Sequence, residues 1–219
     1  FEINRVSRQE LNNERGTIIV RGAPLRILAP WVLNNSSGKI IAIPRKNQPP
    51  FEAYQSGLST LFSKVMAFEF GTLKNDQGII SDLGAYSLLP QDLRIPPLRS
   101  GTPGLHNRGG LIALSSAHLK MAGDMYNAHG FLDFPEGAKL KFLNYIDIPL
   151  GAEEPSKVIV NGKLTWDSHD LTTSGVIHGN DASLTTTNLH SKPGSQITAK
   201  NKLVLGDWRE ELPFGPARF

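Results

Sequence analysis

The chain has 219 residues, 39% of them hydrophobic, with a formal net charge of +3 and a pI of about 9.2. Because it contains no cysteine, disulfides, zinc–thiolate sites and thiol catalysis are excluded. Basic residues are scattered among acidic ones and do not alternate with aromatic residues, so we expect no nucleic-acid binding. The chain has no apolar run of about 18 residues, so we expect no membrane span.

A short pattern recurs along the chain, in which an apolar residue is followed by Asn, then by Gly and an apolar stretch. Close copies begin at Leu11, Leu33, Leu73, Leu105 and Met125, and looser copies begin at Leu171 and Leu189. Repetition with a period of about 20 residues is typical of a solenoid, in which each repeat buries its apolar side chains against its neighbours. The sequence therefore predicts an all-β fold, a parallel β-helix of roughly seven to nine coils.

The recurrent polar and small residues have expected positions in such a coil. Residues 17–20 and 25–27 are short β-type runs, and Arg21-Gly22-Ala23-Pro24 between them is a turn. We expect the recurrent Asn side chains to stack at a corner as an amide ladder. We expect the recurrent Gly residues to supply the left-handed backbone that a sharp corner requires.

Three segments interrupt the repeat. Within residues 51–70, apolar side chains recur at helical spacing: Tyr54, Leu58, Leu61, Phe62, Val65 and Met66. This spacing predicts an amphipathic helix that either packs on the scaffold or faces a partner. The expected division is solenoid coils over 1–43, a helical insert over 44–72, and coils over 73–219 with loop excursions at 89–104 and 144–157. Since long loops on rigid scaffolds often bind ligands, the candidate partner-binding residues are Tyr54, Leu58, Phe62, Met66 and Tyr145.

The repeats have a family resemblance. The stretch 119–132, with its strand, Ala-Gly turn, Asn and Gly, is similar to the haemagglutination-type repeats of filamentous haemagglutinins. Related contact-dependent growth-inhibition proteins, which are also two-partner secretion exoproteins, carry the same repeats. Residues 11–42 and 171–205 fit this pattern too. The secretion-domain Asn-Pro-Asn motif is absent, so we expect an internal segment of such a protein.

The resemblance implies a right-handed parallel β-helix in a protein that is secreted to the bacterial cell surface. Its implied partners are the outer-membrane transporter that exports the parent protein and a receptor or glycan on a neighbouring cell. Adhesion and toxin delivery are both known roles in this family, and the repeats do not distinguish them.

One dense cluster of ionisable residues stands out. The segment 167–170, Asp-Ser-His-Asp, is followed by His178 and Asp181. Stacked coils could bring these carboxylates and imidazoles together around a metal ion. Their spacing does not match a tight ligand motif, so we expect no metal, no cofactor and no catalytic residue.

Two functional hypotheses follow from the sequence. The first is a non-enzymatic, rigid β-helical filament for adhesion or cell–cell contact, with the inserts as candidate receptor-binding elements or with the whole chain serving as a spacer. The alternative is a β-helix enzyme that acts on a polysaccharide through Asp167 or Asp170. Such enzymes need several carboxylates on one strand face, whereas the recurrent positions here hold Asn, Gly and aliphatic residues.

Overall fold

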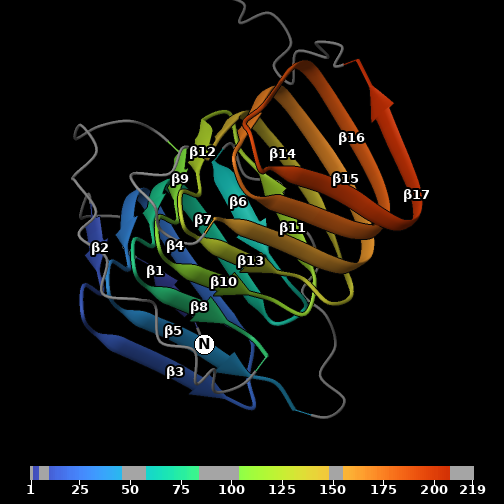
Figure 1. Cartoon of the computed structure of the whole chain (residues 1–219). Helices are drawn as coiled ribbons and strands as arrows, with labels where there is room; N and C mark the ends of the chain where they lie inside the picture. The colour runs from blue at the N-terminus through green and yellow to red at the C-terminus, as the bar shows by residue number, and fades with distance from the viewer. Residues whose placement is uncertain (1, 5–9, 46–57, 84–103, 148–154, 208–219) are drawn as a thin grey trace, which may run out of the picture.

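The protein is a parallel β-solenoid of about seven turns, as predicted (Figure 1). The computed structural model describes residues 2–4, 10–45, 58–83, 104–147 and 155–207. All helix or strand structure in these ranges is β-strand. Accordingly, no helix in the described residues is long and apolar enough to cross a membrane.

Each coil contributes to three sheets that run the length of the solenoid. The first sheet contains β2 (Glu10–Asn12), β9 (Gly104–His106), β12 (Asp124–Tyr126) and the ends of β4 (Leu25–Asn34), β7 (Met66–Lys74), β14 (Gly137–Ile146), β15 (Lys157–Thr173) and β16 (Val176–Ser191). The second contains β3 (Thr17–Arg21), β5 (Lys39–Ile43), β8 (Ile79–Ser81), β10 (Leu111–Ala113), β13 (Phe131–Asp133) and the starts of β15, β16 and β17 (Gln196–Gly206).

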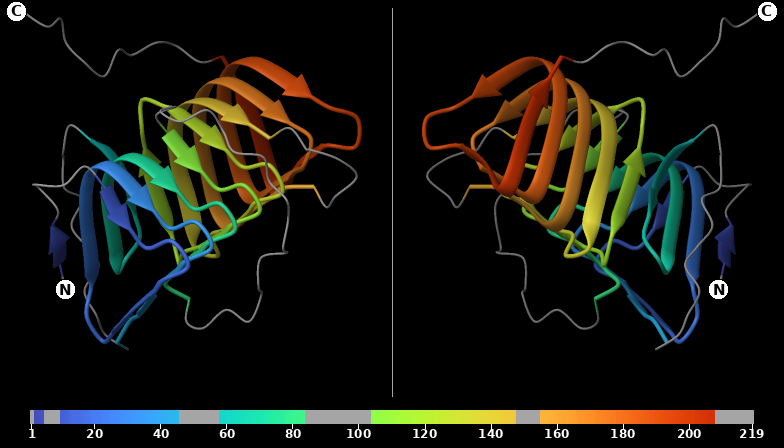
Figure 2. Two further views of the ribbon diagram at one scale, coloured as in Figure 1. Left: turned by 90° about the vertical axis from the view of Figure 1, so that its left-hand side faces the viewer. Right: turned by 90° about the vertical axis from the view of Figure 1, so that its right-hand side faces the viewer.

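The third sheet completes each coil. It contains β1 (Glu2–Asn4), β6 (Ser59–Phe62), β11 (Ala117–Lys120), the starts of β4, β7 and β14, the middle of β15 and β16, and the end of β17. The coils are stacked along one axis, with β1 and β3 near one end and β17 at the other (Figure 2).

The core consists of columns of apolar side chains that point inward from the three sheets. Strand pairing places Ile40, Ile80, Ile112 and Leu132 in one column, and all four are fully or almost fully buried. The largest buried side chain, Trp166, lies edge-on to Phe142 and Tyr145, with ring centroids 5.0 and 4.8 Å away. The recurrent apolar positions of the sequence are therefore the contacts between successive coils.

The predicted helix is wrong for the described part of its range, residues 58–70. Here β6 and the start of β7 form an antiparallel hairpin, and the other edge of β6 pairs antiparallel with β11. The turn is closed by Ser63, whose Oγ accepts a hydrogen bond from the Met66 N–H at 3.2 Å. Short apolar runs are compatible with either a helix or a strand. In this chain the strand is stabilised because β6 has a hydrogen-bonded neighbour on both edges. The rest of the predicted helix lies outside the described residues.

The predicted boundaries of two interruptions shift as a consequence. Strand β7 pairs with β4 from Met66 onward, so the solenoid already includes the end of the predicted 44–72 insert. Strand β14 continues to Ile146, so the start of the predicted excursion at 144–157 is also a solenoid strand. The predicted excursion at 89–104 lies outside the described residues except for Gly104.

The predicted asparagine ladder is confirmed. Each side-chain Nδ2 donates a hydrogen bond to the Oδ1 of the Asn in the next coil, over 2.7 to 2.8 Å, in the order Asn13, Asn35, Asn75, Asn107 and Asn127. The last Nδ2 donates to the Tyr145 hydroxyl at 3.1 Å. Because these amides are buried, the ladder supplies hydrogen-bond partners that water cannot.

A carboxylate replaces the amide in the coil after Asn127. Asp147 is fully buried and accepts hydrogen bonds from the Ser156 hydroxyl, from Thr173 Oγ1 at 3.2 Å and from the Gly175 N–H at 3.1 Å. Neighbouring Tyr145 is also buried, and burial raises the pKa of its phenol above the usual value. The corner is thus hydrogen-bonded by hydroxyl and backbone donors where the ladder ends.

The predicted reason for the recurrent glycines is wrong for the five close copies of the repeat, and it holds for Gly194 in a looser copy, where φ is 87°. The left-handed residue of the turn is the one before the glycine, such as Ser37 with φ of 53° or His129 with φ of 55°. The glycine itself is needed because the previous coil approaches closely. A Cβ on Gly110 would collide with the Asn75 carbonyl oxygen and would lie 2.7 Å from Asn107 Oδ1.

Replacing Ser37 with Gly is expected to raise the free energy of unfolding by about 0.5 kcal/mol, because relief of the left-handed conformation exceeds the entropy cost of glycine. The same replacement at Ser36, which is not left-handed, is expected to lower it by a similar amount. Urea unfolding of both variants checks this, and a loss of stability in Ser37→Gly would contradict it.

Candidate functional site

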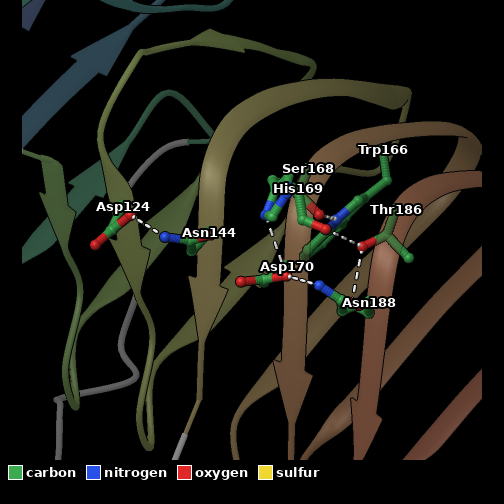
Figure 3. A network of polar contacts seen from close by, with 8 residues as sticks. All are labelled: Asp124, Asn144, Trp166, Ser168, His169, Asp170, Thr186 and Asn188. Atoms are coloured by element: carbon green, nitrogen blue, oxygen red, sulfur yellow. Dashed lines mark hydrogen bonds and ion pairs between the residues drawn. The ribbon is translucent and has the colours of Figure 1, made fainter. Parts of the chain in front are cut away.

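A row of polar side chains runs along the outside of the first sheet. Asp124, Asn144, Asp170 and Asn188, here called the polar row, directly precede the inward apolar residue of four successive coils. Asn144 Nδ2 donates to Asp124 Oδ1 at 2.8 Å, and Asn188 Nδ2 donates to Asp170 Oδ1 at 2.6 Å (Figure 3). The first three are partly exposed and Asn188 is exposed, so the row is accessible to a ligand.

Hydrogen bonds and packing at the corner between the third and first sheets hold the row in place. Thr186 Oγ1 lies 2.9 Å from the His169 carbonyl oxygen and 3.1 Å from the Asn188 carbonyl oxygen, which ties neighbouring coils together (Figure 3). In the interior, Trp166 Nε1 donates to Ser168 Oγ at 2.9 Å. The row therefore lies on backbone that is fixed by both packing and hydrogen bonds.

Two acidic groups of the row have defined electrostatic surroundings. The hydrogen bond from Asn188 holds the pKa of Asp170 below its ordinary value, and His169, with Nδ1 3.2 Å from Asp170 Oδ1, acts in the same direction. The Tyr126 hydroxyl donates to Asp124 Oδ2 at 3.1 Å. Burial, together with the Asp124 carboxylate, raises the pKa of the Tyr126 phenol, so it remains a hydrogen-bond donor. The row is thus a set of fixed acceptors and donors.

The structure does not bring the predicted ligand cluster together. Asp167 lies on the third sheet, where it forms an ion pair with Lys141 at 3.0 Å. His178 lies on the second sheet with its Nδ1 2.9 Å from Thr198 Oγ1. Only His169 and Asp170 remain adjacent. The described part of the chain contains no group of three or more His, Asp or Glu side chains that could hold a metal ion.

The predicted partner-binding residues do not form one surface. Met66 and Tyr145 are fully buried in the core, because both occupy inward positions of solenoid strands. Phe62 is half-buried and packs on the His118 ring, with centroids 4.6 Å apart. Leu58 is half-buried, and Tyr54 lies outside the described residues. A partner therefore cannot contact Met66 or Tyr145 on the folded protein.

The polar row was missed by sequence reasoning, although a signal was present. In the four repeats that begin at Met125, Tyr145, Leu171 and Leu189, the preceding residue alternates between Asp and Asn. Aligning these repeats on their apolar residue would have placed the four polar side chains in one column. The Tyr145 copy was hidden because Asp147 stands where the ladder Asn is expected.

The fold and the polar row define the class of the protein as a parallel β-solenoid with an ordered polar surface along its axis. Comparisons with protein-family models, with curated proteins and with solved structures found no match.

A buried carboxylate outside the row provides a pH-dependent test of the structure. Asp82, 3% exposed, accepts hydrogen bonds from the Ser115 N–H at 2.5 Å and from the hydroxyls of Ser63 and Ser115. Burial raises its pKa above the ordinary 3.8, and these hydrogen bonds only partly oppose the rise. Asp82 therefore joins its own turn to the turns at Ser63 and Ser115 through a carboxyl group that is protonated more easily in the folded protein than in the unfolded chain.

Because the folded pKa of Asp82 is raised, its contribution to stability is fully present below pH 3.8 and is lost as pH rises through the folded pKa. The variant Asp82→Asn lacks this titration. Relative to that variant, the wild type is expected to lose stability as pH rises from below 3.8 to neutral. Urea unfolding at a series of pH values measures the difference, and a difference that does not change with pH would contradict the expectation.

Proposed function

We propose that the chain is a rigid segment of an exported bacterial surface protein, and that its polar row contacts a glycan or receptor on a neighbouring cell. The observation that carries this proposal is the row itself, Asp124, Asn144, Asp170 and Asn188, lying outward along the solenoid axis. Successive coils place its members about 4.8 Å apart. The resemblance of the repeats to filamentous haemagglutinins supports the same role.

The chemistry of the row favours recognition of hydroxyl-rich ligands. Carboxylate and amide oxygens accept hydrogen bonds, and amide nitrogens donate them. The row therefore offers both an acceptor and a donor to a sugar hydroxyl, which itself donates and accepts. The carboxylates of Asp124 and Asp170 lie two coils apart, with Asn144 on the coil between them. Two coil spacings amount to about 9.6 Å. The lowered pKa of Asp170 makes it a poor proton donor at neutral pH. The lowered pKa of Asp170 therefore supports binding over hydrolysis with Asp170 as the proton donor.

The test is binding of the labelled chain to intact bacterial and host cells and to a glycan array. The double variant Asp170→Ala/Asn188→Ala is expected to lower affinity about tenfold or more, because it removes half of the row. The matched control Asp181→Ala/Asn201→Ala removes one exposed carboxylate and one exposed amide away from the row. It is expected to bind like the wild type.

Three outcomes would count against the proposal. Equal binding by the row variant would show that the contact lies elsewhere, and no binding to any cell or glycan would contradict adhesion. Depolymerisation of an acidic polysaccharide that is lost in Asp167→Asn or Asp170→Asn would instead support the enzyme alternative.

A further inference from the structure

The coil at the C-terminal end of the described solenoid is uncovered on one side. Strand β17 pairs with β16 on one edge, and no described strand pairs with the other edge. Leu205 is 57% exposed, whereas its register partner Leu184, one coil further in, is 1% exposed. Leu189 is likewise 41% exposed and its partner Leu171 is buried. No other described coil therefore covers the inward apolar positions of this coil.

The opposite end of the described solenoid is also open. Strand β3 pairs with β5, and within the described residues its other edge has no partner strand. An open hollow of about 570 Å³ lies here, lined by Ile3, Ala23 and the five residues of β3. Ile18 at this end is partly exposed, whereas its register partner Ile40 is fully buried.

The two ends carry matching side chains at matching positions. Following the strand pairing from coil to coil places Ile18 and Ile197 in one inward column. The same procedure places Leu11 and Leu189 in a second column. If the N-terminal coil of a second copy were placed on the C-terminal coil of the first, both columns would therefore continue in register.

We propose that a second copy of the chain stacks head to tail on the first, with β1–β3 of one copy lying against the β16–β17 end of the other. This inference goes beyond the proposed function and uses a different surface. Parallel pairing would give a partner to the edge of β17 that no described strand pairs with. It would also bury Leu205 and Ile18, as the contacts between internal coils bury their own apolar side chains. Because the two contacting surfaces differ and lie at opposite ends, each copy can bind two others and extend a filament.

Charged residues at the junction predict how head-to-tail association responds to a charge reversal. In register, Lys192 at the turn after β16 comes next to Glu14 at the turn after β2, an opposite-charge pair. Lys200 comes next to Arg21, a like-charge pair. Reversing the charge of Lys200 is therefore expected to tighten head-to-tail association.

Sedimentation velocity of the full chain across a wide range of concentrations tests the proposal. The wild type is expected to associate progressively beyond a dimer. Ile18→Lys at one end and Leu205→Lys at the other are each expected to weaken association about tenfold or more. Mixing these two variants restores a one-to-one complex, because each retains the end that the other lacks. Lys200→Glu, a substitution at an exposed position, is expected to strengthen association several-fold.

Leu143→Lys and Lys139→Glu are the matched controls, because both residues are exposed on the side of the solenoid. They are expected to leave association unchanged. The proposal is overturned if the wild type stays monomeric at every concentration, as it would if only a following coil of a longer chain covered this end. It is also overturned if both end variants associate like the wild type, or if Leu143→Lys weakens association.

Discussion

Replacing Asn75 with Ala is expected to lower the free energy of unfolding by about 3–5 kcal/mol. Asn75 is fully buried, accepts a hydrogen bond from Asn35 Nδ2 at 2.7 Å and donates to Asn107 Oδ1 at 2.8 Å. Its removal leaves a buried donor on one side and a buried acceptor on the other, each costing about 1–3 kcal/mol. Urea unfolding followed by circular dichroism measures the loss.

Two controls show whether position in the ladder matters. Asn201→Ala changes an exposed amide and is expected to alter stability by less than about 0.5 kcal/mol. Asn13→Ala is expected to cost less than Asn75→Ala, because Asn13 is the first amide of the ladder and its removal leaves acceptors, but no ladder donor, without a partner. If Asn75→Ala costs no more than Asn201→Ala, the ladder does not stabilise the solenoid.

Replacing Gly110 with Ala is expected to destabilise the protein by about 3 kcal/mol. The added Cβ would collide with the Asn75 carbonyl oxygen, a backbone atom that cannot rotate away. The Gly110 N–H also donates to the Asn107 carbonyl oxygen at 3.2 Å, so the turn cannot shift without losing that bond. The thermal midpoint and the urea midpoint are both expected to fall.

Gly206→Ala is the matched control for steric space. A Cβ there would meet only Thr185 Oγ1, at 4.0 Å, and the residue has no left-handed backbone. The change is expected to be neutral or to stabilise by up to about 0.5 kcal/mol through the unfolded chain. Equal effects at Gly110 and Gly206 would show that the close approach between coils is not the reason for the recurrent glycine.

The solenoid and its ladder could be predicted because they depend on repetition. An Asn that returns at the same place in each repeat stacks on its predecessor once the coils stack, as Asn75 and Asn107 do. The role of the glycine could not be assigned correctly from sequence. Its contact is with the backbone of the previous coil, at Asn75 for Gly110, and only the three-dimensional turn reveals this distance.

The strand β6 could not be predicted, because its conformation depends on a distant partner. Leu61 pairs with Leu119 of β11, far along the chain, and the local apolar spacing does not indicate that pairing.

The solvent accessibility of individual side chains could not be predicted either. Ile79, Leu111 and Ala113 form a buried apolar cluster separate from the main core, although they alternate with core residues along their strands. Which outward residues face solvent is thus a tertiary property.

The most direct test of the central claim, that an asparagine ladder joins stacked coils, is hydrogen exchange of the side-chain amides measured by nuclear magnetic resonance. The Nδ2 protons of Asn35, Asn75 and Asn107 are expected to exchange far more slowly than those of exposed Asn201, because they are buried and hydrogen-bonded in series. If the ladder amides exchange as fast as Asn201, the coils are not joined in this way.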